Sequence, residues 1–201
     1  MKITEVNQVG SFIEVKLIYS KSISIEYLRG QYVNLAVAGA KRSYSICELN
    51  NHKKVLTLII SPVLGGVVTE YFATSPIGQK IRVEIPLGSF VYREPNNSNI
   101  LSAYVCTGSG IVPLMNTFDG GRTLPQNVCV YWGVRKNCEM VSKIHLASTG
   151  KIKIFISSSD TFHTHETGRL RWESIDQRES IENWYLVGNP QMIDDFSRLC
   201  Y

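Results

Sequence analysis

Apolar and polar positions alternate over short stretches in about the first ninety residues, and this period of two predicts β-strands. Residues 80–85 alternate cleanly, residues 12–19 mix alternating and continuous apolar positions, and residues 54–60 end in a continuous apolar run; each is expected to form a strand. Residues that favour turns separate them, at positions 38–40, 50–51, 65–66 and 76–78. Several short strands at this spacing are typical of a small antiparallel barrel. One helix is expected among them, from Val67 to Ala73.

The pattern changes after a polar stretch at residues 92–99, which is rich in proline, asparagine and serine and indicates a linker. Beyond it, apolar runs without alternation are separated by helical or irregular stretches. These runs are residues 100–106, 128–132, 152–157 and 184–187. Continuous apolar strands at this spacing predict a parallel sheet with covering helices. We therefore expect a β-barrel domain over residues 1–95 and a small α/β domain over residues 99–201.

Candidate chemistry begins with the tetrapeptide Arg42, Ser43, Tyr44 and Ser45 on an expected strand. A guanidinium binds phosphate by forked hydrogen bonds, an aromatic ring stacks on a flat ligand, and a hydroxyl can bond a ring heteroatom. The set suits a ring ligand that carries a diphosphate. The alternative is an exposed edge strand with ordinary polar residues.

Two glycine-rich turns are further candidates for binding an anionic ligand. Gly65 and Gly66 open the expected short helix, where backbone N–H groups and the helix dipole favour an anion; the alternative is a hairpin turn before a frayed helix. The second turn, residues 107–110, follows the first strand of the expected parallel sheet, and Pro113 suits the first turn of the next helix. Open α/β sheets bind nucleotides at this edge, although a plain strand-to-helix turn has the same pattern.

Seven segments in order resemble the ferredoxin–NADP reductase family of FAD-binding flavoproteins. The tetrapeptide matches the Arg-x-Tyr-Ser signature of that family, and the resemblance extends from about Gly30 to Met192. The matching segments are Gly30–Tyr32, Arg42–Ser45, Gly65–Thr69, Pro86–Phe90, Thr107–Pro113, Tyr131–Arg135 and Gly188–Met192.

The resemblance implies an FAD-binding barrel, an α/β domain for NADPH or NADH, and electron transfer to an acceptor protein or small molecule. Tyr44 and Ser45 would lie beside the reacting flavin ring. The cofactor-binding residues that the resemblance implies are Arg42, Ser43, Tyr44, Ser45, Gly65, Gly66, Val67, Thr69, Thr107, Gly108, Ser109, Gly110, Arg135, Gly188, Asn189 and Pro190.

Two departures from the family pattern leave an alternative open. Val187 stands where the family usually has cysteine, and the sequence stops at Tyr201, before the family's final strand and aromatic tail. The leading hypothesis is an FAD-dependent NAD(P)H reductase. The alternative is a weak or inert FAD- or nucleotide-binding subunit or sensor that needs a partner chain. The choice between NADPH and NADH stays open, since Arg135, Arg169 and Arg171 suit either a 2′-phosphate or solvent.

Charge, cysteine content and hydrophobicity argue against several other classes of protein. The net charge of +4 is spread along the chain, so nucleic-acid binding is not indicated. The five cysteines form no Cys-x-x-Cys pair, and we expect neither disulfides, an iron–sulfur centre nor another metal site; His163 and His165 are interpreted as loop residues. No apolar run is long enough to cross a bilayer. We expect a cytoplasmic protein, either monomeric or completed by a partner.

Overall fold

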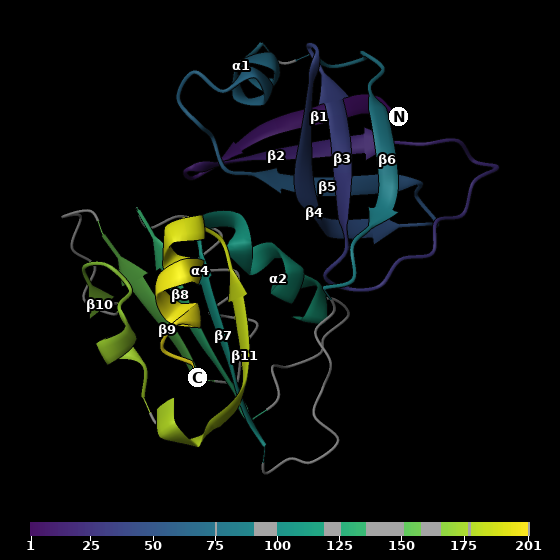
Figure 1. The fold of residues 1–201 in the computed structure, drawn as a ribbon. Helices are drawn as coiled ribbons and strands as arrows, with labels where there is room; N and C mark the ends of the chain where they lie inside the picture. The colour runs from purple at the N-terminus through teal and green to yellow at the C-terminus, as the bar shows by residue number, and fades with distance from the viewer. Residues whose placement is uncertain are drawn as a thin grey trace. The chain divides into compact units, whose positions relative to one another are not determined.

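The computed structural model describes residues 1–74, 76–90, 100–118, 126–135, 151–157, 166–176 and 178–200. The chain divides into two compact units, which are described separately. The first comprises Met1–Tyr92 with Val112–Asn116, and the second Arg93–Ile111 with Thr117–Tyr201. The first is an antiparallel β structure and the second an α/β structure (Figure 1).

The first unit is a six-stranded antiparallel sheet in the order β1-β2-β5-β4-β3-β6. Its elements are β1 (Lys2–Val9), β2 (Phe12–Ile18), β3 (Tyr32–Val37), β4 (Ala40–Asn50), β5 (Val55–Ile60), α1 (Val67–Ala73) and β6 (Arg82–Leu87). The start of β1 also bonds to the segment before β6: Ile3 N donates to Gln79 O at 2.9 Å, and Ile81 N to Met1 O at 2.9 Å. These bonds connect the outer strands and close the barrel, which confirms the expected architecture.

The core of this unit follows from alternation along its strands. In β3, Val33 and Leu35 are fully buried and Val37 is nearly so, because every second side chain of a strand lies on the same face. A two-residue turn joins β3 to β4, with φ of 47° at Ala38 and 77° at Gly39. Positive φ at both central positions is the geometry of tight hairpins whose twist matches their strands.

Strand β4 changes partner along its length. It pairs with β3 from Ala40 to Ser45 and with β5 from Ile46 to Asn50, with a register shift between Ile46 and Glu48. At the change of partner, Ile46 is in register with Leu58 of β5, while its backbone N–H donates to Gln31 O, just before β3, at 3.1 Å. Residues 42–45 therefore lie immediately before the point where the strand leaves one partner for the next.

The second unit contains a five-stranded parallel sheet in the order β10-β9-β8-β7-β11, which confirms the expected α/β fold. Its elements are β7 (Leu101–Thr107), η1 (Gly108–Ile111), β8 (Val128–Val134), β9 (Lys151–Ile156), β10 (Glu166–Thr167), η2 (Trp172–Ser174), η3 (Arg178–Ser180), β11 (Ile181–Val187) and α4 (Pro190–Ser197). Helix α2 (Val112–Phe118) follows η1, and its residues Val112–Asn116 are counted with the first unit. Because the first strand in sequence lies beside the last, the carboxyl ends of β7 and β11 are neighbours.

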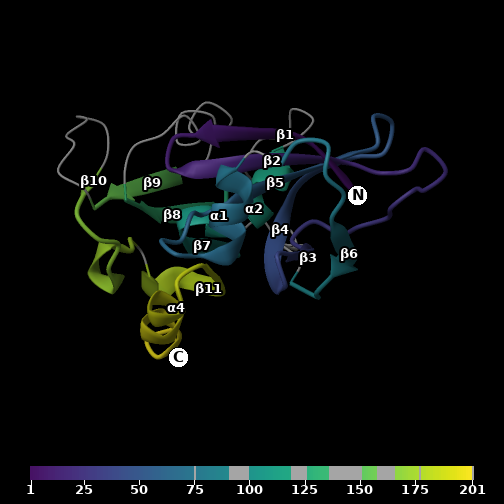
Figure 2. The same ribbon diagram turned by 90° about the horizontal axis from the view of Figure 1, so that it is seen from above.

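The two faces of this sheet differ. One face presents Ala103, Val105 and Tyr131, and α4 covers it with Met192 and Phe196. Figure 2 shows α4 on one side of these strands. The register pairs Tyr104 with Val130 and Cys106 with Trp132 on the other face, and all four side chains are fully buried.

Helices are short throughout the part of the chain that the structure describes. The α-helices contain seven or eight residues each, whereas a helix that crosses a bilayer needs about 20.

Candidate functional site

Arg42 and Tyr44 share one face of β4, because they lie two positions apart on a regular strand. Their partners on β3 are Leu35 and Val33, which are fully buried. Arg42 is nevertheless exposed, and its Nη1 donates to the carbonyl oxygen of Lys41 at 2.8 Å. The remaining guanidinium N–H groups make no ion pair with a carboxylate of the described residues. One face of β4 thus presents a cation beside an aromatic ring.

Tyr44 is half-buried against the barrel core. Burial raises the pKa of its hydroxyl, and the positive charge of Arg42 partly offsets this effect. The side chain is therefore a neutral phenol at physiological pH. A neutral ring, part packed and part open, is suited to stacking on a flat ligand.

Ser43 lies on the opposite face of β4, within a polar network. Its Oγ donates to Asn34 Oδ1 at 2.7 Å, and Asn34 Nδ2 donates to Glu84 Oε2 at 3.3 Å. Lys41 forms an ion pair with the same carboxylate at 2.5 Å. The structure therefore uses the Ser43 hydroxyl to connect β4, β3 and β6. Ser45 is partly buried and pairs with Tyr32 at the end of the β3–β4 ladder.

Gly65 and Gly66 form the corner before α1. Gly65 has φ of 68°, which favours glycine, while a Cβ at Gly66 would lie 2.9 Å from Val63 O. Thr69 Oγ1 accepts from Val63 N at 2.9 Å, so the threonine fixes this corner. Gly66 is the N-cap and supplies no side chain to the first N–H groups of α1, which have no carbonyl partner within the helix.

Two of the matching segments pack against each other. A Cβ at Gly30 would lie 2.3 Å from Phe90 O, and one at Gly88 would lie 2.6 Å from the ring of Tyr32. Gln31 Nε2 donates to Gly88 O at 3.0 Å. The segments at residues 30–32 and 86–90 therefore brace β3, which carries the partner positions of Arg42 and Tyr44.

In the second unit, the glycine turn after β7 lies directly against the end of β11. A Cβ at Gly110 would lie 2.5 Å from Val187 O, and one at Gly188 would lie 2.3 Å from Thr107 Oγ1. Gly188 also has φ of 134°. The turn after β7 can lie this close to the end of β11 only because positions 110 and 188 carry no side chain. Two segments that are distant in sequence therefore meet here.

Thr107 connects this corner to α4. Its Oγ1 accepts from the backbone N–H of Asn189 at 2.8 Å. Asn189 is the N-cap of α4, where its Oδ1 accepts from Gln191 N at 2.8 Å and Pro190 occupies the first turn. The start of α4 and the turn after β7 therefore form one edge of the sheet, where α/β proteins bind nucleotides.

The arginines considered for a 2′-phosphate are exposed. Arg135 directly follows β8. Strands β8 and β7 end at the same edge of the sheet, because Gly133 is in register with Thr107. Arg169 and Arg171 are exposed in the segment after β10. His163 and His165 lie outside the described residues.

The cysteines that can be placed are free thiols: Cys47, Cys106, Cys129 and Cys200. Cys106 and Cys129 are buried core residues, as expected. Cys138 lies outside the described residues. Within the described ranges, no three His, Cys, Asp or Glu side chains are grouped to hold a metal ion.

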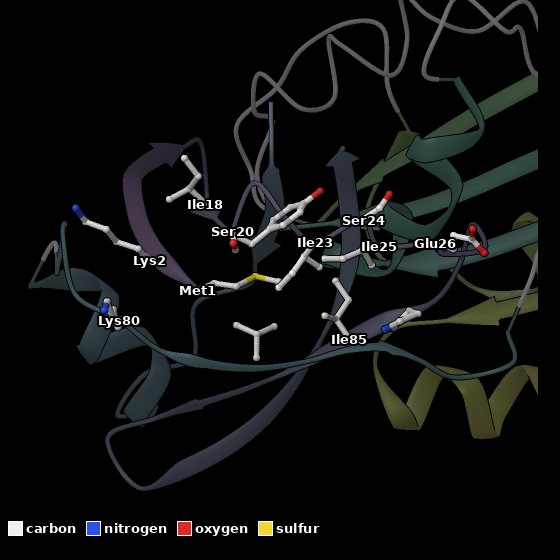
Figure 3. A pocket seen from close by; sticks show the side chains of 13 residues that line it. Met1, Lys2, Ile18, Ser20, Ile23, Ser24, Ile25, Glu26, Lys80 and Ile85 are labelled. Atoms are coloured by element: carbon white, nitrogen blue, oxygen red, sulfur yellow. The ribbon is translucent and has the colours of Figure 1, made fainter. Parts of the chain in front are cut away.

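The barrel also has a pocket of about 780 Å³ that involves none of the expected site residues. Figure 3 shows isoleucine side chains in its middle, Lys2 and Lys80 together at one side and Glu26 at the other. Asn51 holds the wall formed by the β2–β3 connection: its Oδ1 accepts from Ile25 N at 3.0 Å and its Nδ2 donates to Ile25 O at 2.9 Å.

Sequence comparison identifies the first unit. Residues 2–92 match a family model described as the oxidoreductase FAD-binding domain. The chain is 27% identical to the CDP-6-deoxy-L-threo-D-glycero-4-hexulose-3-dehydrase reductase of Yersinia pseudotuberculosis, over 96% of this chain and 61% of the relative. It is 30% identical to the toluate 1,2-dioxygenase electron transfer component of Pseudomonas putida, over 98% of this chain and 61% of the relative. The chain thus spans about three fifths of these relatives.

Solved structures share the fold. The Amycolatopsis cytochrome P450 reductase GcoB superposes with a TM-score of 0.75 at 23% identity, over 98% of this chain and 63% of that one. A ferredoxin NADP⁺ reductase from Neisseria gonorrhoeae, with FAD and NADP bound, superposes with a TM-score of 0.72 at 19% identity, over 98% of this chain and 88% of that one. At these identities the likeness establishes the architecture of both units.

Proposed function

We propose that the chain belongs to the ferredoxin–NADP reductase-like FAD/NAD(P)-binding oxidoreductases and is an NAD(P)H-dependent flavoprotein reductase. Bound FAD would take a hydride from NADPH or NADH and release the electrons to an acceptor. Residues 1–95 are proposed to bind FAD and residues 99–201 the dinucleotide. The observation that carries the proposal is the exposed Arg42 beside the half-buried ring of Tyr44 on one face of β4.

The residues of the first unit fit FAD. The Arg42 guanidinium has free N–H groups for a diphosphate, and the neutral ring of Tyr44 can stack on the isoalloxazine. At the corner of Gly65, Gly66, Val67 and Thr69, the backbone N–H groups that open α1 would bind the diphosphate, while Gly66 N donates to Val63 O at 2.9 Å and shapes the corner. Ser45 would orient the ring by a hydrogen bond. We assign Ser43 a supporting role through its backbone, because its hydroxyl is bonded to Asn34.

The residues of the second unit fit a dinucleotide. The turn at Thr107, Gly108, Ser109 and Gly110 and the start of α4 at Gly188, Asn189 and Pro190 form one glycine-lined edge, where the lack of side chains permits a close approach to a phosphate. Arg135 at the end of β8 is the proposed contact for a phosphate at this edge. These residues would hold and orient the dinucleotide, and the geometry of the two rings then governs the rate.

The test of FAD binding is Arg42→Ala, with Arg82→Ala as the matched control. Arg82 is also a surface arginine of the barrel, with 81% of its side chain exposed. A hydrogen bond to a charged group contributes about 1.5–3 kcal/mol, so the dissociation constant of FAD should rise about 10-fold to 150-fold in Arg42→Ala and hardly change in Arg82→Ala. Equal flavin affinity in the two variants would contradict the assignment.

The test of turnover is an absorbance spectrum of the FAD-loaded protein, recorded without oxygen before and after addition of NADPH or NADH. Loss of the flavin bands would establish reduction and identify the donor. The named relatives, a dehydrase reductase and a dioxygenase electron transfer component, support an acceptor that is an oxygenase component or another redox protein.

A second candidate function follows from Val187. Its carbonyl lies against Gly110 at the proposed dinucleotide edge, and its side chain has no thiol. An inert FAD-binding subunit that needs a partner chain would keep its flavin oxidised with both donors, whereas the reductase would not.

A further inference from the structure

Two buried aromatic side chains hold the carbonyl groups of the glycine turn after β7. Trp132 Nε1 donates to Gly108 O at 2.8 Å, and Tyr104 OH donates to Gly110 O at 3.0 Å. Both side chains are completely buried and lie on the sheet face opposite α4. They come from adjacent strands, and Tyr185 of β11 stacks on Tyr104 with ring centroids 6.2 Å apart. An aromatic layer with two donors therefore lies beneath the turn.

These donors select one orientation of flexible peptide groups. Glycine adopts positive and negative φ with similar ease, and Gly108 has φ of 53°, so the sequence of the turn does not by itself fix which way its carbonyls point. In a planar trans peptide, the C=O and the following N–H point in opposite directions. The bonds from Trp132 and Tyr104 hold the oxygens of Gly108 and Gly110 toward the sheet and keep both carbonyl groups from turning outward.

Orientation matters for an anionic ligand, because a carbonyl oxygen turned toward a diphosphate would repel it and an N–H group would attract it. We infer that Tyr104 and Trp132 are positioning residues of the dinucleotide site, which hold the carbonyls of Gly108 and Gly110 away from the phosphates. This inference rests on the proposed function for its ligand. Neither aromatic side chain contacts the ligand; each acts through the turn.

The test uses Tyr104→Phe and Trp132→Phe, which remove one donor each and keep an aromatic ring. Tyr131→Phe is the matched control: it removes the hydroxyl of a neighbouring buried tyrosine on the other face, which accepts from Asp176 N at 3.2 Å. The first measurement is hydrogen–deuterium exchange in residues 107–111 of the protein without dinucleotide. A net hydrogen-bond contribution of about 1 kcal/mol predicts exchange about threefold to tenfold faster in the two test variants.

The second measurement is the dissociation constant of NADP⁺ and of NAD⁺ by calorimetry on FAD-loaded protein. Tyr104→Phe and Trp132→Phe should raise it about threefold to tenfold and leave flavin content unchanged. Tyr131→Phe should change neither exchange in the turn nor the dissociation constant. Exchange in residues 107–111 that is the same in all variants would overturn the inference. A wild-type chain that bound neither NADP⁺ nor NAD⁺ would instead overturn the proposed dinucleotide function, while exchange would still decide whether the two side chains orient the turn.

Discussion

A methyl group added at Gly188 would meet three atoms of Thr107, at 2.3 Å, 2.8 Å and 2.9 Å. Two of the three are backbone atoms, which cannot rotate aside. Single residues of this kind decide whether β7, β11 and α4 can meet at the proposed dinucleotide edge. Their importance is not local, because the atoms that exclude a side chain belong to a segment about 80 residues earlier in the chain.

We predict that Gly188→Ala is much more damaging than Gly168→Ala. Both glycines have positive φ, 134° and 108° respectively, but nothing lies within 4 Å of a Cβ at Gly168. Gly168→Ala should cost about 1–2 kcal/mol from backbone strain, and Gly188→Ala about 1–3 kcal/mol more from the clash. Urea unfolding of both variants measures the difference, and equal losses would show that Thr107 moves aside.

Tyr131 gives a prediction about alkaline stability. Burial, with a smaller effect of the neighbouring Cys129 thiol, raises the pKa of Tyr131 to about 12, from an ordinary value of about 10. The folded state favours the neutral phenol, so this contribution is complete below about pH 10 and is lost as the pH rises through about 12. The stability difference between wild type and Tyr131→Phe should therefore shrink from about pH 10 upward. Urea unfolding at several pH values measures this difference. If the stability difference stayed constant from about pH 10 to about 12, the prediction would be contradicted.

A strand or helix could be predicted from the sequence where its own residues show the hydrophobic pattern or the turn residues of that element. The strands β2, β5, β7 and β8 and the helix α1 lie where alternation, apolar runs and glycine turns indicate them. The strands β1 and β3 were not identified, although they complete the barrel. Contacts between distant segments could not be predicted: Trp132 is 24 positions from the carbonyl that it holds, and no local pattern encodes such a bond. The hydrogen bonds of Asn51 with Ile25 are likewise contacts between distant segments that no local pattern encodes.

Asn51 fixes the β2–β3 connection, which has no regular structure of its own. Its Oδ1 accepts from Tyr19 OH at 2.8 Å, in addition to its two bonds with the Ile25 backbone. Asn51→Ala should therefore destabilise the barrel by about 2–3 kcal/mol, since three bonds are lost and two backbone groups lose their partner. Asn50→Ala is the control, because its Oδ1 accepts one exposed bond, from Lys53 N. A similar loss in both variants, measured by urea unfolding, would refute this role.

At the scale of the whole molecule, the described residues of each unit form a hydrophobic core of their own. All three tryptophans, Trp132, Trp172 and Trp184, belong to the second unit. Tryptophan fluorescence therefore reports unfolding of the second unit, and circular dichroism reports both. The change in hydrophobic pattern near residues 92–99 predicts a domain boundary there, and both this boundary and the assignment of one cofactor to each domain stay predictions.

If FAD binds only the first unit, it should stabilise that unit by about 2.7 kcal/mol at a concentration 100 times its dissociation constant. We predict that FAD shifts the urea transition seen by circular dichroism to higher concentration and leaves the tryptophan emission transition less affected. Equal shifts by the two probes would mean that the units unfold together and that the prediction is wrong.

The position of β11 beside β7 has a consequence for the order of events on the ribosome. All strands of the barrel have been translated by Leu87, whereas the edge formed by Thr107, Gly110 and Gly188 needs residues 187–189. At about 5–20 residues per second, roughly 100 residues of further synthesis take about 5–20 s. A nascent chain would therefore be able to load flavin seconds before its dinucleotide edge exists.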